Sequence, residues 1–333
     1  MYELMTPTML ARGGVLLTVW AVAAGWPRGR LTGRLRRDGW QRICRGAWAV
    51  PGKEVDWRVR ARAVQLLRPE LVCSHRTAAA LHRIELPAEG RRPVDAEEVL
   101  EFAALPPHRG GTAGRGWIRV YGTSRLTDRD CSLRRGLRVT SPARTVGDLI
   151  RAAGSREAAV LVADSALSHR FVDGLRRAPL VRVEELAAEL AAPRCPGGPA
   201  ARRWLALAVP GSGSPAETVA RLRMRDAGLH PEVQPTLHTL TGRPLRPDFY
   251  FRAAGLAVEI EGFAFHGTRE AHERDVRRFN ELQNCPGVRR VLRFTAHEVF
   301  ARPDRMTATV RAALTALTAL TAVTALAARP GAP

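Results

Sequence analysis

The chain contains almost no lysine. Of its 52 basic side chains only Lys53 is a lysine, and the others are arginines. No lysine follows position 53, which excludes lysine-assisted chemistry from the rest of the chain. The arginine skew is typical of a GC-rich genome. The sign of the charge is informative, because 52 basic and 32 acidic residues give a net charge of +20. Such a surplus favours partners that carry phosphates, either nucleic acid or an anionic membrane.

Cysteine is also scarce and scattered. The five cysteines are Cys44, Cys73, Cys131, Cys195 and Cys285, and none lies within four residues of another. The missing C-x-x-C spacing excludes the usual paired metal or redox motif. An odd, dispersed set indicates reduced thiols, and we expect a cytoplasmic protein.

Long hydrophobic runs are missing as well. The apolar stretch 14–26 is too short to span a bilayer, and the Ala/Thr-rich stretch 312–328 repeats every three residues and so forms no steady apolar face. We therefore expect no membrane partner. A signal peptide at 14–26 and a tail anchor remain less favoured alternatives.

The order of expected elements predicts a multidomain α/β chain. The expected parts are an N-terminal winged helix-turn-helix (1–60), an α+β middle domain (61–195), a linker (196–213), a restriction-endonuclease-like α/β sandwich (214–318) and a low-complexity tail (319–333). Within the sandwich we expect helices at 215–228, 269–284 and 303–320, and strands at 232–240, 248–252, 256–262 and 289–294.

The first sixty residues form the most basic stretch, with 11 basic and 4 acidic residues and therefore a difference of +7. A short helix ending at Gly25, a second helix beginning at Pro27, and two short strands around 45–46 predict a winged helix-turn-helix. The alternative is a small basic subdomain that is simply solvated. The expected DNA contacts are Arg28, Arg30, Arg34, Arg37 and Arg45.

The middle region offers polar residues but no catalytic pattern. His75, His82, Asp148 and Asp164 lie in expected helices. For each of them we expect capping or a structural hydrogen bond rather than catalysis.

The stretch "LRPDFYFRAAGLAVEIEGFAFHG" (245–267) places carboxylates in an apolar hairpin. Glu259 and Glu261 share one strand face, and the intervening turn brings Asp248 alongside. Like charges on one face repel, and a divalent cation removes that penalty. We therefore predict Mg²⁺ (or Mn²⁺) held by Asp248 and Glu259, with His266 as the nearest acid–base group. A solvated sheet face is the alternative.

Together, "PD" at 247–248, "VEIEG" and "FHG" resemble the nuclease core written PD-(D/E)XK. The branch that it resembles most is the Vsr-like branch, related to very-short-patch-repair endonucleases, and the resemblance covers residues 214–316. It implies that Asp248 and Glu259 bind metal and that Glu261 is the acidic residue that this branch carries where others have lysine. It also implies that His266 activates water or protonates the leaving oxygen.

Two further acidic residues have a weaker place in this resemblance. Glu217 matches an acidic residue of the branch's first helix, but it also completes a capping box with Ser214. Asp275 is more typical of a solvated helix position. The repair enzymes' structural zinc has no ligand set here, since Cys285 stands alone, and their mismatch-reading wedge cannot be located. Mismatch specificity is therefore not implied.

The front half resembles the AbiEi-type antitoxin proteins. The resemblance rests on "GRLTGRLRRDGWQRICRGAWAVPG", "VCSHRTAAALHRIELP" and "VTSPARTVGDLIRAAGSREAAVLVADSAL", and covers about residues 10–170. It implies a winged helix joined to a second domain that acts in transcriptional control.

Two functions follow from these patterns. The first is a DNA-binding, divalent-metal-dependent endonuclease that hydrolyses phosphodiester bonds in DNA. The second is an AbiEi-type antitoxin or transcriptional regulator whose nuclease-like domain is inactive and whose partner is a cognate toxin. Neither function requires a small-molecule cofactor.

Overall fold

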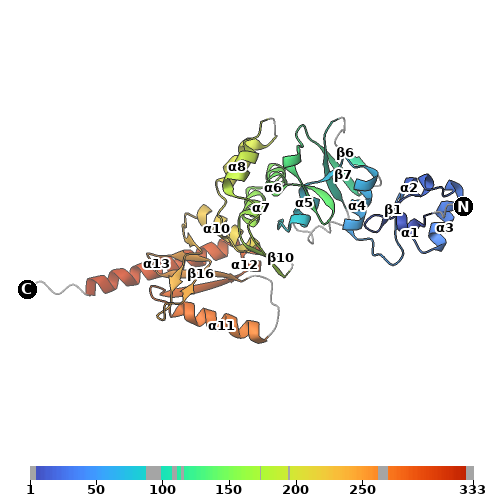
Figure 1. Ribbon diagram of the computed structural model, residues 1–333. Helices are drawn as coiled ribbons and strands as arrows, with labels where there is room; N and C mark the ends of the chain where they lie inside the picture. Colours follow the sequence, from blue (N-terminus) through green and yellow to red (C-terminus); the bar gives the residue numbers. More distant parts are fainter. Residues whose placement is uncertain are drawn as a thin grey trace, which may run out of the picture. The chain divides into compact units, whose positions relative to one another are not determined.

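The computed structural model describes residues 5–87, 99–106, 111–113, 116–172, 174–193, 196–261 and 269–327. The chain divides into two compact units (Figure 1). The first unit comprises residues 1–152 and 184–196, and the second comprises residues 153–183 and 197–333. Both contain helices and sheets, so the predicted α/β multidomain class is confirmed.

The first unit begins with the arrangement of a winged helix-turn-helix. Its elements are α1 (Pro7–Leu10), β1 (Val15–Leu17), α2 (Thr18–Ala23), α3 (Arg28–Arg37), β2 (Gln41–Cys44) and β3 (Ala47–Ala49). The strands form an antiparallel sheet in the order β1-β3-β2. Gly25 follows α2 with φ +96°, a conformation that favours glycine. Leu31 and Leu35 of α3 are buried against Trp40 and Trp48. The helix, turn, helix and hairpin were predicted, whereas β1 was not, because its apolar residues run into α2 without a break.

Helix α4 (Trp57–Leu67) joins the winged helix to the middle sheet. Asp56 caps it, since its carboxylate accepts a hydrogen bond from the Val59 amide at 2.8 Å. Val59 and Ala63 pack against the winged-helix strands, while Ala61 and Val64 belong to the middle core. Because one helix is buried on two faces, the predicted boundary at residue 60 falls inside a continuous element.

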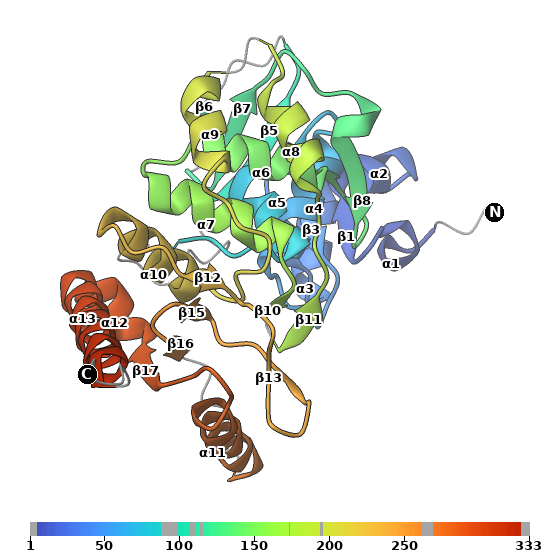
Figure 2. The ribbon, with the colours of Figure 1, turned by 90° about the vertical axis from the view of Figure 1, so that its left-hand side faces the viewer.

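The middle of the first unit is a six-stranded sheet in the order β6-β7-β5-β4-β9-β8, with helices α4 and α5 against it and α6 packed on α5 (Figure 2). The strands are β4 (Val72–Cys73), β5 (Leu100–Ala104), β6 (Gly111–Ala113), β7 (Ile118–Gly122), β8 (Cys131–Arg134) and β9 (Leu137–Thr140). The helices are α5 (His75–His82), the 3-10 helix η1 (Asp128–Asp130), α6 (Pro142–Arg151) and α8 (Val183–Leu190). The pairs β4–β9 and β5–β7 are parallel and the other pairs antiparallel, which makes the sheet mixed.

His82 and Asp148 make structural hydrogen bonds of the predicted kind. His82 Nε2 lies 2.8 Å from the Thr140 carbonyl oxygen. Asp148 accepts hydrogen bonds at 2.7 Å from both Arg144 and Arg151. Such pairing is what a buried carboxylate requires.

The second unit contains the predicted α/β sandwich. Its elements are α7 (Arg156–Leu167), β10 (Arg170–Val172), β11 (Leu175–Arg177), α9 (Gly198–Leu205), α10 (Pro215–Asp226), β12 (Glu232–Val233), β13 (Leu237–His238), β14 (Pro244–Leu245), β15 (Phe249–Phe251), β16 (Leu256–Glu261), α11 (Arg269–Gln283), β17 (Arg290–Thr295), α12 (Ala296–Ala301) and α13 (Pro303–Ala327). The central sheet has the order β12-β15-β16-β17, with only β16 and β17 parallel.

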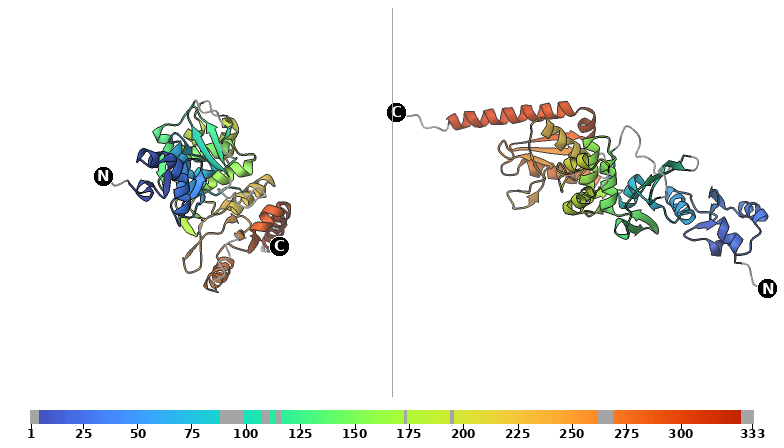
Figure 3. Two further views of the ribbon diagram at one scale, coloured as in Figure 1. Left: turned by 90° about the vertical axis from the view of Figure 1, so that its right-hand side faces the viewer. Right: turned by 90° about the horizontal axis from the view of Figure 1, so that it is seen from above.

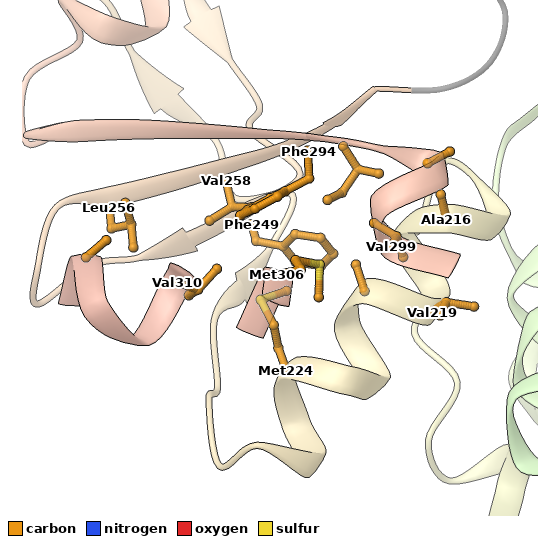
Figure 4. Packing of buried hydrophobic residues seen from close by; sticks show 14 of the residues in the cluster. Ala216, Val219, Met224, Phe249, Leu256, Val258, Phe294, Val299, Met306 and Val310 are labelled. Atoms are coloured by element: carbon orange, nitrogen blue, oxygen red, sulfur yellow. The ribbon is translucent and has the colours of Figure 1, made fainter. Parts of the chain in front are cut away.

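Two apolar clusters cover the two faces of this sheet. Phe249 and Val258 pack with α10, α12 and α13 on one face (Figure 4). Tyr250 and Ala257 pack with Leu282 of α11 on the other face. Because side chains alternate along β15 and β16, one face of these strands packs in the main core and the other face packs against α11.

Two elements of the sandwich differ from the prediction. The single strand expected at 232–240 is two short strands, β12 and β13, that join different sheets. Gln234, with φ +44°, and Pro235 interrupt it, because proline lacks the amide hydrogen needed to continue pairing. Helix α12 was not predicted, although Thr295 and Glu298 form a capping box at its start.

The boundary of the sandwich also differs from the prediction. Residues 153–183, assigned to the middle domain, belong to the second unit, and α9 of the predicted linker contacts α7. The buried carboxylate of Asp164 in α7 accepts from the Thr218 hydroxyl at 2.9 Å and from Arg221 Nη2 at 2.7 Å, both in α10. The Val209 amide donates to the same carboxylate at 2.8 Å. These three bonds tie α7 and the chain after α9 to the first helix of the sandwich.

Helix α13 extends past the predicted start of the low-complexity tail at residue 319, as one continuous helix (Figure 3). Val310, Ala313 and Leu317 are buried and follow one another at intervals of three and four residues. Part of the Ala/Thr-rich stretch therefore does present an apolar face to the core. Within the described ranges, no helix combines the length and the apolar character needed to cross a membrane.

Replacing Asp164 with alanine should destabilise the second unit by about 3 kcal/mol, because Arg221 would stay buried without its charged partner. Chemical unfolding of the full chain, followed by a probe in the second unit, measures this loss. Asp226→Ala is the control, since the carboxylate of Asp226 pairs with Arg156 at an exposed position and should contribute less than about 1 kcal/mol. Equal losses in the two variants would contradict the anchoring role of Asp164.

Candidate metal centre

The register of β15 and β16 brings two of the predicted metal ligands together. Phe249 pairs with Val258, so continuing the register by one residue sets Asp248 opposite Glu259. Asp248 Oδ2 accepts a hydrogen bond from the Ile260 amide at 2.7 Å, which confirms this proximity. Because side chains alternate along a strand, both carboxylates lie on the face that α11 covers. The two residues are thus cross-strand neighbours, as the sequence predicted.

Glu217 approaches the same place from helix α10. Its buried carboxylate accepts from the Gly213 amide at 2.7 Å and from Gln234 Nε2 at 3.0 Å. The Ser214 hydroxyl caps the helix by accepting from the Glu217 amide at 3.2 Å. The side chain of Glu217 therefore bonds one residue before the cap rather than closing the capping box with Ser214.

The electrostatics show that these carboxylates crowd one another. Burial, together with the charges of Glu217 and Glu259, raises the pKa of Asp248 well above its usual range. Burial also raises the pKa of Glu259, while Arg278 and Arg293 oppose that shift. A buried group of like charges is costly to the fold and needs a compensating cation or proton.

Arg278 of α11 is the cation that contacts Glu259, and it was not among the predicted site residues. Its Nη1 donates to Glu259 Oε2 at 2.5 Å, and its Nη2 lies 3.3 Å from Oε1. Nη2 also donates to the Arg246 carbonyl oxygen at 2.7 Å. Nothing in the sequence distinguishes Arg278 from its neighbours Arg274 and Arg277.

Glu261 belongs to a separate ion-pair network at the end of β16. Arg293 of β17 lies 2.6 Å from Glu261 and 2.7 Å from Asp275. Asp275 is 48% exposed, which agrees with the solvated helix position expected for it. The remaining predicted catalytic residue, His266, lies outside the described residues.

The donor chemistry of the site fits a hard divalent cation. Within the described part of the chain, no three His, Cys, Asp or Glu side chains stand close enough to hold a metal ion. The charge effects on Asp248 act over longer distances than coordination bonds, so the two observations agree. Mg²⁺ is commonly held by only one or two carboxylates with water and phosphate oxygens. Asp248 and Glu259 supply such a pair, and in this state Glu259 is occupied by Arg278.

A second candidate site is a basic pocket in the winged helix. Its volume is about 370 Å³. The polar lining comes from α2, α3 and the β2–β3 hairpin, and the apolar lining includes Trp48 and Leu67. The polar residues are Thr18, Arg28, Thr32, Arg42 and Arg45. Arg42 was not predicted, although it lies on the wing only three residues before Arg45.

The other predicted DNA contacts lie outside this pocket. Arg30, Arg34 and Arg37 are exposed on α3. Arg34 pairs with Asp38 at 2.7 Å, and such a surface pair leaves it accessible to a phosphate.

Comparison with known proteins gives little information about function. No family model and no curated protein matches the chain. The chain is similar to the RV2827C protein from Mycobacterium tuberculosis, seen in a crystal structure, with a TM-score of 0.41 and 17% identity over 66% of this chain and 78% of that chain. A similarity at this level supports no conclusion about the site.

Asp248→Asn should stabilise the metal-free chain near neutral pH, because it removes a carboxylate whose pKa the fold raises. The asparagine side chain can still accept the Ile260 amide hydrogen bond. A raised folded-state pKa costs stability once the pH exceeds the unfolded value, so the gain should shrink as the pH falls towards about 4. Thermal unfolding in EDTA across this pH range measures the difference. A variant less stable than wild type at pH 7 would contradict the crowding of charges.

Proposed function

We propose that the protein is a DNA-binding, divalent-metal-dependent endonuclease that hydrolyses phosphodiester bonds in DNA. The observation that carries the proposal is the cross-strand pair of the half-buried Asp248 and the buried Glu259, which stand beside the buried Glu217. Like charges placed together in a core do not serve stability, so their placement favours a functional role. The resemblance of the surrounding motif to the PD-(D/E)XK nucleases points in the same direction.

In this proposal each group has a distinct task. Asp248 and Glu259 hold Mg²⁺ or Mn²⁺, and Glu217 adds negative charge beside them. The ion, when bound, lowers the pKa of a water molecule and offsets charge on the scissile phosphate. His266 is the proposed acid–base residue, and Glu261 supports the outer end of the site through Arg293.

The winged helix supplies the proposed contact with DNA. Phosphate contacts give most proteins their general affinity for DNA, and arginine binds phosphate through a planar fork of donors. The pocket formed with Arg28, Arg42 and Arg45 fits a backbone phosphate, and Arg30, Arg34 and Arg37 extend the basic surface along α3. The free thiols of Cys44, Cys73, Cys131 and Cys285 support the proposed cytoplasmic location.

A regulatory function of the AbiEi type is the second candidate. The observation that favours it is that the winged helix and its basic pocket form within the first unit, independently of the carboxylates. In this case the protein would bind an operator without metal, and its partner would be a cognate toxin.

Nicking of supercoiled plasmid DNA tests the nuclease directly. Wild-type protein should nick in Mg²⁺ or Mn²⁺ and not in EDTA. Glu259→Gln should lower the rate by roughly 100-fold or more, since a metal ion supplies several kcal/mol of transition-state stabilisation. Glu232→Gln is the matched control, because Glu232 is an exposed strand carboxylate paired with Arg252, and should retain full activity. Unchanged nicking by Glu259→Gln would remove the assignment.

A gel-shift series in rising salt tests the basic pocket. Arg45→Gln should weaken binding to any duplex by a similar factor and reduce the slope of log affinity against log salt by about 0.9. Arg129→Gln, at an exposed arginine of the same unit on η1 and not on the winged helix, should leave the slope unchanged. A salt-independent affinity in the wild-type protein would rule out phosphate contact by this surface.

A further inference from the structure

The side chain of Arg278 contacts the carboxylate site from α11. It is 41% exposed, whereas the side chain of Glu259 is 12% exposed. Arg278 is therefore the more exposed partner of this ion pair. Its second nitrogen is fixed by the Arg246 carbonyl oxygen at 2.7 Å.

The contact with Arg278 engages both oxygens of Glu259. Nη1 lies 2.5 Å from Oε2, and Nη2 lies 3.3 Å from Oε1. A guanidinium and a divalent cation on one carboxylate would repel each other at short range. Arginine cannot relieve this by losing a proton, because it stays charged in proteins. The two cations are therefore alternative partners of Glu259.

We propose that Arg278 is an internal counter-ion that a divalent cation must displace from Glu259 before the site is complete. The inference rests on the proposed function, since it takes Asp248 and Glu259 as the metal ligands. In the metal-free chain the guanidinium neutralises part of the crowded charge and so stabilises the fold. When metal binds, Arg278 leaves Glu259 and remains anchored on α11 beside the site, where its fork of donors can take a phosphate oxygen.

The role differs from that of an ordinary structural ion pair in the direction of its effect on metal affinity. If Arg278 only supported the shape of the site, its loss would weaken metal binding. If it competes with the metal, its loss strengthens metal binding, while the metal-free chain becomes less stable because Glu259 loses its partner. Metal affinity and metal-free stability therefore change in opposite directions.

Calorimetric titration of the full chain with Mn²⁺ tests the proposal. Arg278→Gln should bind Mn²⁺ roughly tenfold more tightly than wild type, with a lower unfolding temperature in EDTA. Arg277→Gln is the matched control, because Arg277 is the exposed neighbour on the same helix, and should match wild type in both measurements. If Arg278→Gln fails to fold, the Mn²⁺ affinity of Arg278→Lys tests the proposal instead. Lysine keeps the charge but loses the fork, and we expect a tightening of about two- to fivefold.

The outcomes separate this inference from the proposed function. If the wild type binds Mn²⁺ and the Arg278 variant binds it with equal or lower affinity, the displacement is overturned. The nuclease proposal then stands. Absence of Mn²⁺ binding by wild type and variant alike, with nicking that ignores EDTA, would remove the nuclease proposal and this inference with it. Tighter Mn²⁺ binding by Arg278→Gln, with wild-type affinity in Arg277→Gln, would support the displacement.

Discussion

The repulsion between carboxylates on adjoining strands is the constraint on which the candidate site depends. It arises from strand register, because Phe249 and Val258 pair in the main core and so commit Asp248 and Glu259 to the opposite face. A slip of one residue would exchange these faces and bury the acidic pair in the apolar core. The packing that stabilises the sandwich therefore also positions the two carboxylates. The same register is needed for the apolar core and for the acidic pair.

Asp164 and Asp248, two aspartates of the second unit, differ in their hydrogen-bond partners. Asp164 has a guanidinium, a hydroxyl and an amide as donors, which is the full set that a structural carboxylate needs. Asp248 has the Ile260 amide and carboxylate neighbours that raise its pKa. The first arrangement joins helices, whereas the second leaves a demand for positive charge. Arg278 meets part of that demand from α11, which links the state of the site to the position of that helix.

The features that the sequence predicted are those with local causes. Alternation and a short turn sufficed for the face shared by Asp248 and Glu259, and glycine and proline marked the helices of the winged helix. Arg278 could not be predicted, because it reaches Glu259 only after α11 has crossed the sheet. The assignment of α7 to the second unit could not be predicted for a similar reason, since Asp164 of α7 contacts residues of α10 that lie far away in the sequence. Pro235 was a local signal that should have divided the strand expected at 232–240.

The most direct test of the account is a crystal structure of the protein soaked with Mn²⁺, with the ion located by its anomalous scattering. The account predicts one strong peak between the carboxylates of Asp248 and Glu259, with the guanidinium of Arg278 moved away from Glu259. A peak elsewhere on the chain, or no peak while Arg278 still holds Glu259, would contradict it.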